Sequence, residues 1–133
     1  MKIAPFVAAS ALLLAIEPAA ALTPNCEKAC TVVITMSAGC GSGIKVAPDP
    51  VVVPPGATAD ITWSIQSDGW AFDGGNGISI FLADDAFEKG PGSSKTVKFK
   101  NKNKGPRVFK YDVNLVDTKD NSKCKLDPTV VNQ

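Results

Sequence analysis

The stretch Ile44–Ile65, which reads IKVAPDPVVVPPGATADITWSI, decides the fold expected of this chain. Four prolines interrupt it, and they rule out a continuous helix because proline lacks a backbone N–H and clashes with the preceding turn. Near its end, Ile61, Trp63 and Ile65 alternate with polar residues, which is the two-residue period of a half-buried strand. The stretch therefore predicts short β-strands joined by turns.

The prolines also predict where these strands break. Pro48-Asp49-Pro50 separates an apolar strand at Ile44–Ala47 from another at Val51–Val53, because proline cannot donate to a strand ladder. Pro54-Pro55-Gly56 has the composition of a tight turn. The alternating strand at Thr58–Gln66 follows this turn.

Similar patterns predict strands on both sides of this stretch. We expect them at Cys30–Met36, Ile78–Leu82, Ser94–Lys100, Arg107–Asp117 and Cys124–Val131, the last interrupted by Asp127-Pro128. A single helical turn is expected at Asp84–Glu88. Turn signals recur about every eight to twelve residues, which is the spacing of a β-sandwich. The fold class expected is therefore all-β, with a sandwich of seven to eight strands.

The first residues have the composition of an export signal. A positively charged start is followed by the mostly apolar run Ile3–Ile16 and by the small residues Ala19–Ala21, which suit a signal peptidase. The apolar run is shorter than the roughly 20 residues of a membrane helix. We therefore expect a signal peptide at residues 1–21 and one periplasmic or secreted domain at residues 22–133, with no membrane span after cleavage.

The charge of the chain is nearly balanced, with a formal net charge of +1. Such a balance gives no general attraction to nucleic acid or to a membrane surface. We expect a monomer without a nucleic-acid partner.

The cysteine count also fits export. The chain has four cysteines, Cys26, Cys30, Cys40 and Cys124, and an even count in a small exported domain favours disulfides. Spacing alone leaves the three possible pairings open. A metal site built on these cysteines is disfavoured, because Cys26 and Cys30 are spaced more widely than usual zinc ligands and the chain has no histidine.

The absence of histidine excludes several kinds of catalysis. Serine–histidine and cysteine–histidine nucleophiles, and most catalytic zinc sites, need an imidazole. The remaining acid–base candidates, Asp84, Asp85 and Glu88, are interpreted as a solvated acidic turn. We therefore predict no enzyme, no catalytic residue, no metal and no cofactor. The alternative is a divergent carboxylate-based enzyme or a calcium-dependent protein that uses the acidic loops.

The glycine-rich loop Ser67–Gly77 carries the candidate ligand-binding residues, which are Trp70, Phe72, Asp73 and Asn76. The two aromatic residues are interpreted as exposed anchors, since aromatic residues on loops often carry recognition. The alternative is that both cover the core, because aromatic side chains bury large areas. Asp68 joins Asp73 and Asn76 as a possible set of oxygen ligands for calcium, or all three simply mark turns.

A run of basic residues provides the other candidate surface. Its members, all within sixteen residues, are Lys95, Lys98, Lys100, Lys102, Lys104, Arg107 and Lys110. Such a basic face could attract an anionic glycan, a phospholipid head group or an acidic protein partner. The alternative is that these lysines only discourage association between exposed strands.

The chain resembles the cupredoxin-like family of Greek-key sandwiches, including small exported bacterial proteins built on that fold. The residues that carry the resemblance are IKVAPDPVVVPPGATADITW, GWAFDGGNGI, FKYDVNLVD and LDPTVVN. The resemblance implies that the strand at Ile44 runs close to the last strand. It therefore implies a Cys40–Cys124 disulfide, which leaves Cys26 and Cys30 to pair locally or stay free.

The family's copper chemistry does not carry over to this chain. A blue-copper site needs two imidazole nitrogens beside a thiolate, and the chain has no histidine. The function expected is thus a non-catalytic exported binding or structural module without a copper site, with an unknown protein, glycan or anionic surface as partner.

Overall fold

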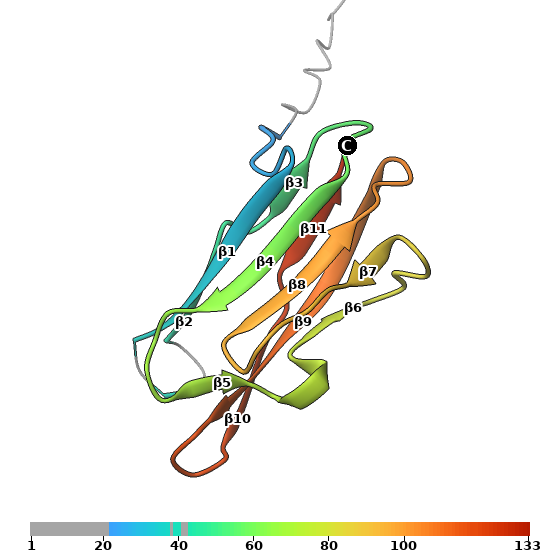
Figure 1. Ribbon diagram of the computed structural model, residues 1–133. Helices are drawn as coiled ribbons and strands as arrows, with labels where there is room; N and C mark the ends of the chain where they lie inside the picture. Colours follow the sequence, from blue (N-terminus) through green and yellow to red (C-terminus); the bar gives the residue numbers. More distant parts are fainter. Residues whose placement is uncertain (1–21, 38, 41–42) are drawn as a thin grey trace, which may run out of the picture.

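The computed structural model describes residues 22–37, 39–40 and 43–133, so the expected signal peptide lies outside the described residues. Two β-sheets pack face to face, as Figure 1 shows, and the expected all-β sandwich is confirmed. Within the described residues, the only helical element is a single 3-10 turn, η1, at Gly74–Asn76. None of the described residues belongs to a helix long and apolar enough to cross a membrane.

The first sheet has the strand order β2-β1-β4-β8-β7. Its strands are β1 (Ala29–Met36), β2 (Ile44–Ala47), β4 (Ala59–Ile65), β7 (Phe87–Lys89) and β8 (Thr96–Asn101). β1 and β4 run parallel, and the other neighbours in this sheet are antiparallel.

The second sheet is organised around the long strand β9. Its strands are β3 (Val51–Val53), β5 (Trp70–Phe72), β6 (Ile78–Ile80), β9 (Arg107–Asp117), β10 (Lys123–Leu126) and β11 (Thr129–Asn132). The order β10-β9-β11-β3 is completed by β5 and β6, which also pair with β9. β3 runs parallel to β11, so the stretch Ile44–Ile65 contributes strands to both sheets and ties them together.

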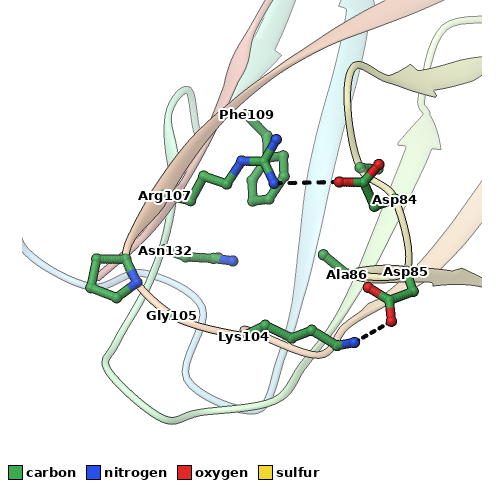
Figure 2. Close-up of a pocket in the computed structure, with 10 residues that line it drawn as sticks. Asp84, Asp85, Ala86, Lys104, Gly105, Arg107, Phe109 and Asn132 are labelled. Atoms are coloured by element: carbon green, nitrogen blue, oxygen red, sulfur yellow. Dashed lines mark hydrogen bonds and ion pairs between the residues drawn. The ribbon is translucent and has the colours of Figure 1, made fainter.

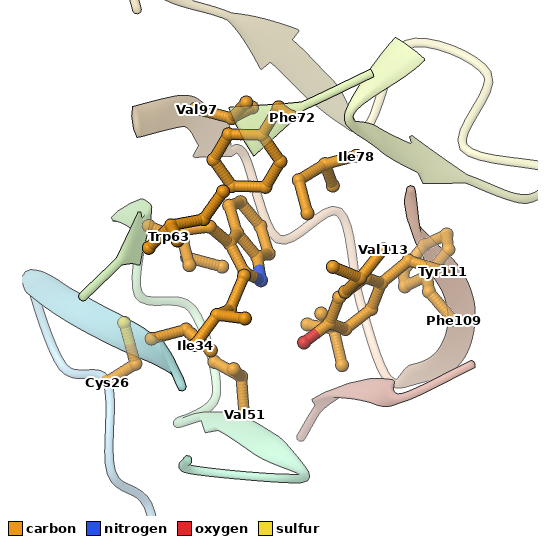
Figure 3. Packing of buried hydrophobic residues seen from close by; sticks show 14 of the residues in the cluster. Cys26, Ile34, Val51, Trp63, Phe72, Ile78, Val97, Phe109, Tyr111 and Val113 are labelled. Atoms are coloured by element: carbon orange, nitrogen blue, oxygen red, sulfur yellow. The ribbon is translucent and has the colours of Figure 1, made fainter. Parts of the chain in front are cut away.

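The core lies between the two sheets and is centred on aromatic rings (Figure 3). Trp63 of β4 is fully buried, and its ring centroid lies 5.4 Å from that of Tyr111 on β9 in an edge-to-face arrangement. Among the described residues, neither the Trp63 Nε1 nor the Tyr111 hydroxyl has a hydrogen-bond partner. Burial raises the pKa of Tyr111 to about 12, because the charged phenolate is poorly solvated there.

The Cys40–Cys124 disulfide implied by the family resemblance is present, and Cys26 and Cys30, which were left to pair or stay free, are also paired. Cys40 and Cys124 are joined across 84 residues of sequence, with their Cα atoms 5.3 Å apart. This bond links the connection between β1 and β2 to β10 of the other sheet. Cys26 and Cys30 form the short bridge, with a Cα separation of 5.2 Å.

The residues before β1 cover the outer edge of β3. The side-chain oxygen of Asn25 accepts a hydrogen bond from the Val52 N–H at 2.7 Å, and the Asn25 side-chain amide donates to the Pro50 carbonyl at 3.0 Å. The backbone N–H groups of Asn25 and Cys26 both donate to the Val52 carbonyl, at 3.0 and 3.1 Å. Backbone groups at the edge of the second sheet are thereby satisfied without another strand.

The helical turn expected at Asp84–Glu88 is absent, and this prediction was wrong. The Ala86 N–H donates to the Ala83 carbonyl at 2.8 Å, which closes a β-turn. Asp84 has a φ of 48°, in the left-handed region, which a right-handed helical turn cannot contain. The chain then continues directly into β7.

Candidate binding cleft

A cleft of about 330 Å³ lies between two connections at one end of the sandwich (Figure 2). One wall is the connection between β6 and β7, and the other is the connection between β8 and β9. We call it the Arg107 cleft; its lining residues are Ala83, Asp84, Asp85, Ala86, Lys104, Gly105, Pro106, Arg107, Phe109 and Asn132. Its volume falls at the lower end of the range for small-molecule sites.

Ion pairs join the two walls of the Arg107 cleft. Lys104 pairs with Asp85, and Arg107 Nη1 lies 3.8 Å from Asp84 Oδ2. The hydrogen bond from Lys104 and its positive charge lower the pKa of Asp85. The two aspartates and two basic side chains cancel in formal charge, so the rim of the cleft is polar but neutral overall.

The Arg107 side chain also forms part of the floor. Its guanidinium carbon lies 4.7 Å from the centroid of the buried Phe109 ring, a cation–π geometry. Its Nη2 donates to the Leu82 carbonyl at 2.8 Å. The distance of 3.8 Å from Arg107 to Asp84 exceeds hydrogen-bonding range, so the Arg107 fork retains N–H donors that can face a ligand.

Buried amides support the base of the cleft. Asn101 and Asn132 exchange side-chain hydrogen bonds of 2.7 and 3.2 Å, and both are almost fully buried. The Asn103 N–H donates to the Asn101 side-chain oxygen at 2.9 Å, and the Asn103 amide donates to the Pro54 carbonyl at 2.8 Å. These bonds fix the β8–β9 connection against β11 and β3, so one wall of the cleft is held in place before any ligand binds.

Unusual backbone conformations occur in both walls. Leu82 and Asp84 have φ values of 52° and 48°, and Asn103 on the opposite wall has a φ of 44°. Asparagine and aspartate tolerate this region, whereas a bulky leucine does so rarely. Backbone strain of this kind tends to gather at functional sites.

The aromatic residues of the predicted ligand-binding loop are buried, although they were expected to be exposed. Trp70 and Phe72 are 9% and 4% exposed and belong to the core, so the expectation that they are exposed was wrong. They lie on β5 at positions paired with Asp117 and Leu115 of β9, which turns their side chains inward. The alternative, that both cover the core, describes their position.

Two polar residues of that loop contact residues of the second sheet. Asp73 Oδ2 lies 3.3 Å from Lys123 Nζ, and the Asn76 carbonyl accepts a hydrogen bond of 2.6 Å from the Asn114 side chain. Across residues 22–37, 39–40 and 43–133, no group of three or more histidine, cysteine, aspartate or glutamate residues is arranged to hold a metal ion.

The basic run is divided between separate parts of the molecule. Lys98 and Lys100 project from the outer face of the first sheet, where Lys100 pairs in register with Asp60 and Glu88. Lys104 and Arg107 border the Arg107 cleft.

Two further members of the run make contacts elsewhere. Lys110 lies 3.7 Å from Asp127 on the second sheet, and Lys95 donates to the Ser67 carbonyl at 2.6 Å. Three of the seven cations therefore have acidic partners.

The Arg107 cleft was not predicted as a site. Asp84 and Asp85 were assigned to a solvated turn, and Lys104 and Arg107 to a basic face. The pairing of these two segments depends on which strands neighbour β9, and no local pattern encodes that.

No protein-family model matches this chain, and no curated protein is similar to it.

Proposed function

We propose that the protein is an exported, non-catalytic binding module with a cupredoxin-like sandwich, and that the Arg107 cleft holds its ligand. The observation that carries the proposal is the neutral, polar rim over a floor that combines the Phe109 ring with the fixed polar side chains of Arg107 and Asn132. A few fixed polar groups around an apolar base are the usual composition of a small-ligand site. The two disulfides are compatible with an oxidising, extracytoplasmic compartment.

The charge balance of the cleft indicates a class of ligand. An anion would be attracted by Arg107 and Lys104 but repelled by the two aspartates of the rim. A cation would be attracted by those aspartates but repelled by Arg107 and Lys104. A ligand without net charge that both donates and accepts hydrogen bonds, such as a small polyol or a zwitterion, satisfies both pairs. The lowered pKa of Asp85 argues against a proton-transfer role, since a general acid or base works best with a pKa near the operating pH.

Amide NMR spectra test this proposal directly. We expect glucose or glycine, each at about 10 mM because unoptimised ligands bind weakly, to shift the backbone amides of residues 83–86, 104, 105 and 107 more than phosphate does. Arg107→Gln should reduce these shifts. Lys110→Gln, which removes a nearby cation outside the cleft, is the matched control and should leave them unchanged.

Two results would count against the Arg107 cleft. If none of the three probes moves the amides of its walls, the proposal fails. If phosphate alone acts, and acts mainly on Lys98 and Lys100, the second candidate function gains support, namely attraction of an anionic surface to the outer face of the first sheet. That candidate rests on the exposure of both lysines and on the lack of an ion pair to either within the described residues.

A further inference from the structure

A separate surface lies on the outer face of the second sheet, where apolar side chains take the place of the expected polar ones. Outward positions on an antiparallel sheet that faces water are normally polar. Here Val108 of β9 is 62% exposed and pairs in register with Val131 of β11, and Phe81 is 48% exposed. We call this surface the Val108 face; its residues are Phe81, Leu82, Val108 and Val131.

The register of the sheet brings the residues of the Val108 face near one another, with Lys110 between Val108 and Phe81. The Phe81 N–H donates to the Lys110 carbonyl at 3.0 Å, so Phe81 lies directly beside β9. Val108 lies two residues from Lys110, about 7 Å along the same side of the strand. Among the described residues, the exposed large hydrophobic side chains are these two, Leu82 and Leu22. Three of the four therefore gather at one place.

Leu82 adds an independent indication that this face is used. Its side chain is 78% exposed, and its φ of 52° lies in the left-handed region. This conformation is unfavourable for a residue with a side chain, and asparagine or glycine would adopt it more readily. The hydrogen bond from Arg107 to the Leu82 carbonyl holds the residue in place. The Leu82 side chain itself is not part of the core cluster.

The charges around the Val108 face indicate what covers it. Lys110 and Asp127 form an ion pair on one side, and Arg107 and Asp84 form another on the other side. The border therefore has no net charge, so an anionic membrane or a strongly charged partner gains little from it. A partner with the same balanced border suits it well, because each cation can exchange one aspartate for another across the contact.

We propose that the Val108 face binds the Val108 face of a second copy of this chain, in a weak dimer with twofold symmetry. Near a twofold axis each residue meets its own copy, which apolar side chains tolerate and like charges do not. An apolar centre with a polar border is also the usual composition of an interface. Four side chains form a small patch, so the association belongs to the weak, transient class. It rests on other observations than the ligand proposed for the Arg107 cleft, although the pair Arg107–Asp84 borders both surfaces.

Sedimentation velocity over a concentration series tests the dimer. We expect the weight-average sedimentation coefficient to rise between about 10 µM and about 1 mM, the range expected of weak interfaces. Leu82→Asn should weaken association at least tenfold, because it removes a central apolar side chain. The same substitution should raise the melting temperature, because it relieves the strain at φ 52°. A purely structural role for Leu82 predicts no effect on association.

Two further variants complete the test. Val108→Lys should also weaken association, and it keeps the proposal testable if Leu82→Asn folds poorly. Lys119→Asn changes an exposed residue beyond the opposite end of β9 from Val108 and should leave association unchanged. The proposal is overturned if the wild-type protein stays monomeric throughout, or if Lys119→Asn acts as strongly as Leu82→Asn. Flotation of a monomeric protein with anionic phospholipid vesicles, lost in Leu82→Asn, would assign the face to a lipid surface instead.

Discussion

The outer faces of the two sheets differ in chemistry, although their inner faces share one core. Outward positions on the first sheet include Asp60, Thr62, Lys98 and Lys100, whereas those around β9 and β11 of the second sheet include the residues of the Val108 face. Both sheets satisfy the same folding requirement on the inside. The difference outside does not follow from the packing of the shared core.

The largest loss of folding stability should come from a substitution in the core that the two sheets share. Trp63→Ala removes a fully buried indole of the first sheet that contacts Tyr111 of the second. We expect a loss of about 3–5 kcal/mol in the free energy of unfolding, from lost burial and from the cavity left behind. Urea denaturation measures it. A loss below about 1 kcal/mol, typical of a surface substitution, would mean that the core is not organised around this ring.

The next prediction concerns Tyr111 of the second sheet, whose raised pKa makes the free energy of unfolding depend on pH. The folded-state pKa of Tyr111 is about 12, above the ordinary value of about 10, so the unfolded chain loses its proton first as the pH rises. The stabilisation is fully present below pH 10 and is lost between about pH 10 and 12, a change of about 3 kcal/mol.

Urea denaturation of the wild type and of Tyr111→Phe across this pH range isolates the tyrosine from the lysines that titrate nearby. The difference in stability between the two proteins should change by this amount. Parallel curves for both proteins would show that Tyr111 ionises as freely in the folded state as in the unfolded chain.

The smallest effect on folding stability is expected when polar residues on the outer face of the first sheet are replaced by apolar ones. This change tests directly whether the chemistry of an outer face controls association. Lys98→Val with Lys100→Val gives the first sheet an apolar outer surface like that of the second. Folding stability should change by no more than about 0.5 kcal/mol per site, because both side chains are exposed. Light scattering should reveal new self-association. If solubility is unaltered, these lysines do not keep the first sheet apart from other molecules.

Much of the fold could be predicted from local patterns. Proline positions and two-residue alternation located β2, β3, β4 and β9, since these signals act within a strand. The exposure of Trp70 and Phe72 was mispredicted because glycines around them resemble an open loop. Their burial arises from pairing with β9, more than forty residues away in sequence.

The candidate site could not be predicted for a related reason. Asp85 and Lys104 are 19 residues apart in sequence, and they meet only because β7 and β8 bring their connections to the same end of the sandwich. Likewise, Val108 occupies an outward position of β9 at which the alternating pattern predicts a polar residue such as lysine. Its exposure depends on what the neighbouring strands leave uncovered.

The contact of Asn25 with β3 has a consequence for how the sandwich meets other β-strands. One amide side chain and two backbone N–H groups occupy the hydrogen-bonding edge that a foreign strand would otherwise extend. The short segment ahead of β1 thus leaves few free backbone groups on β3 to which another strand could be added.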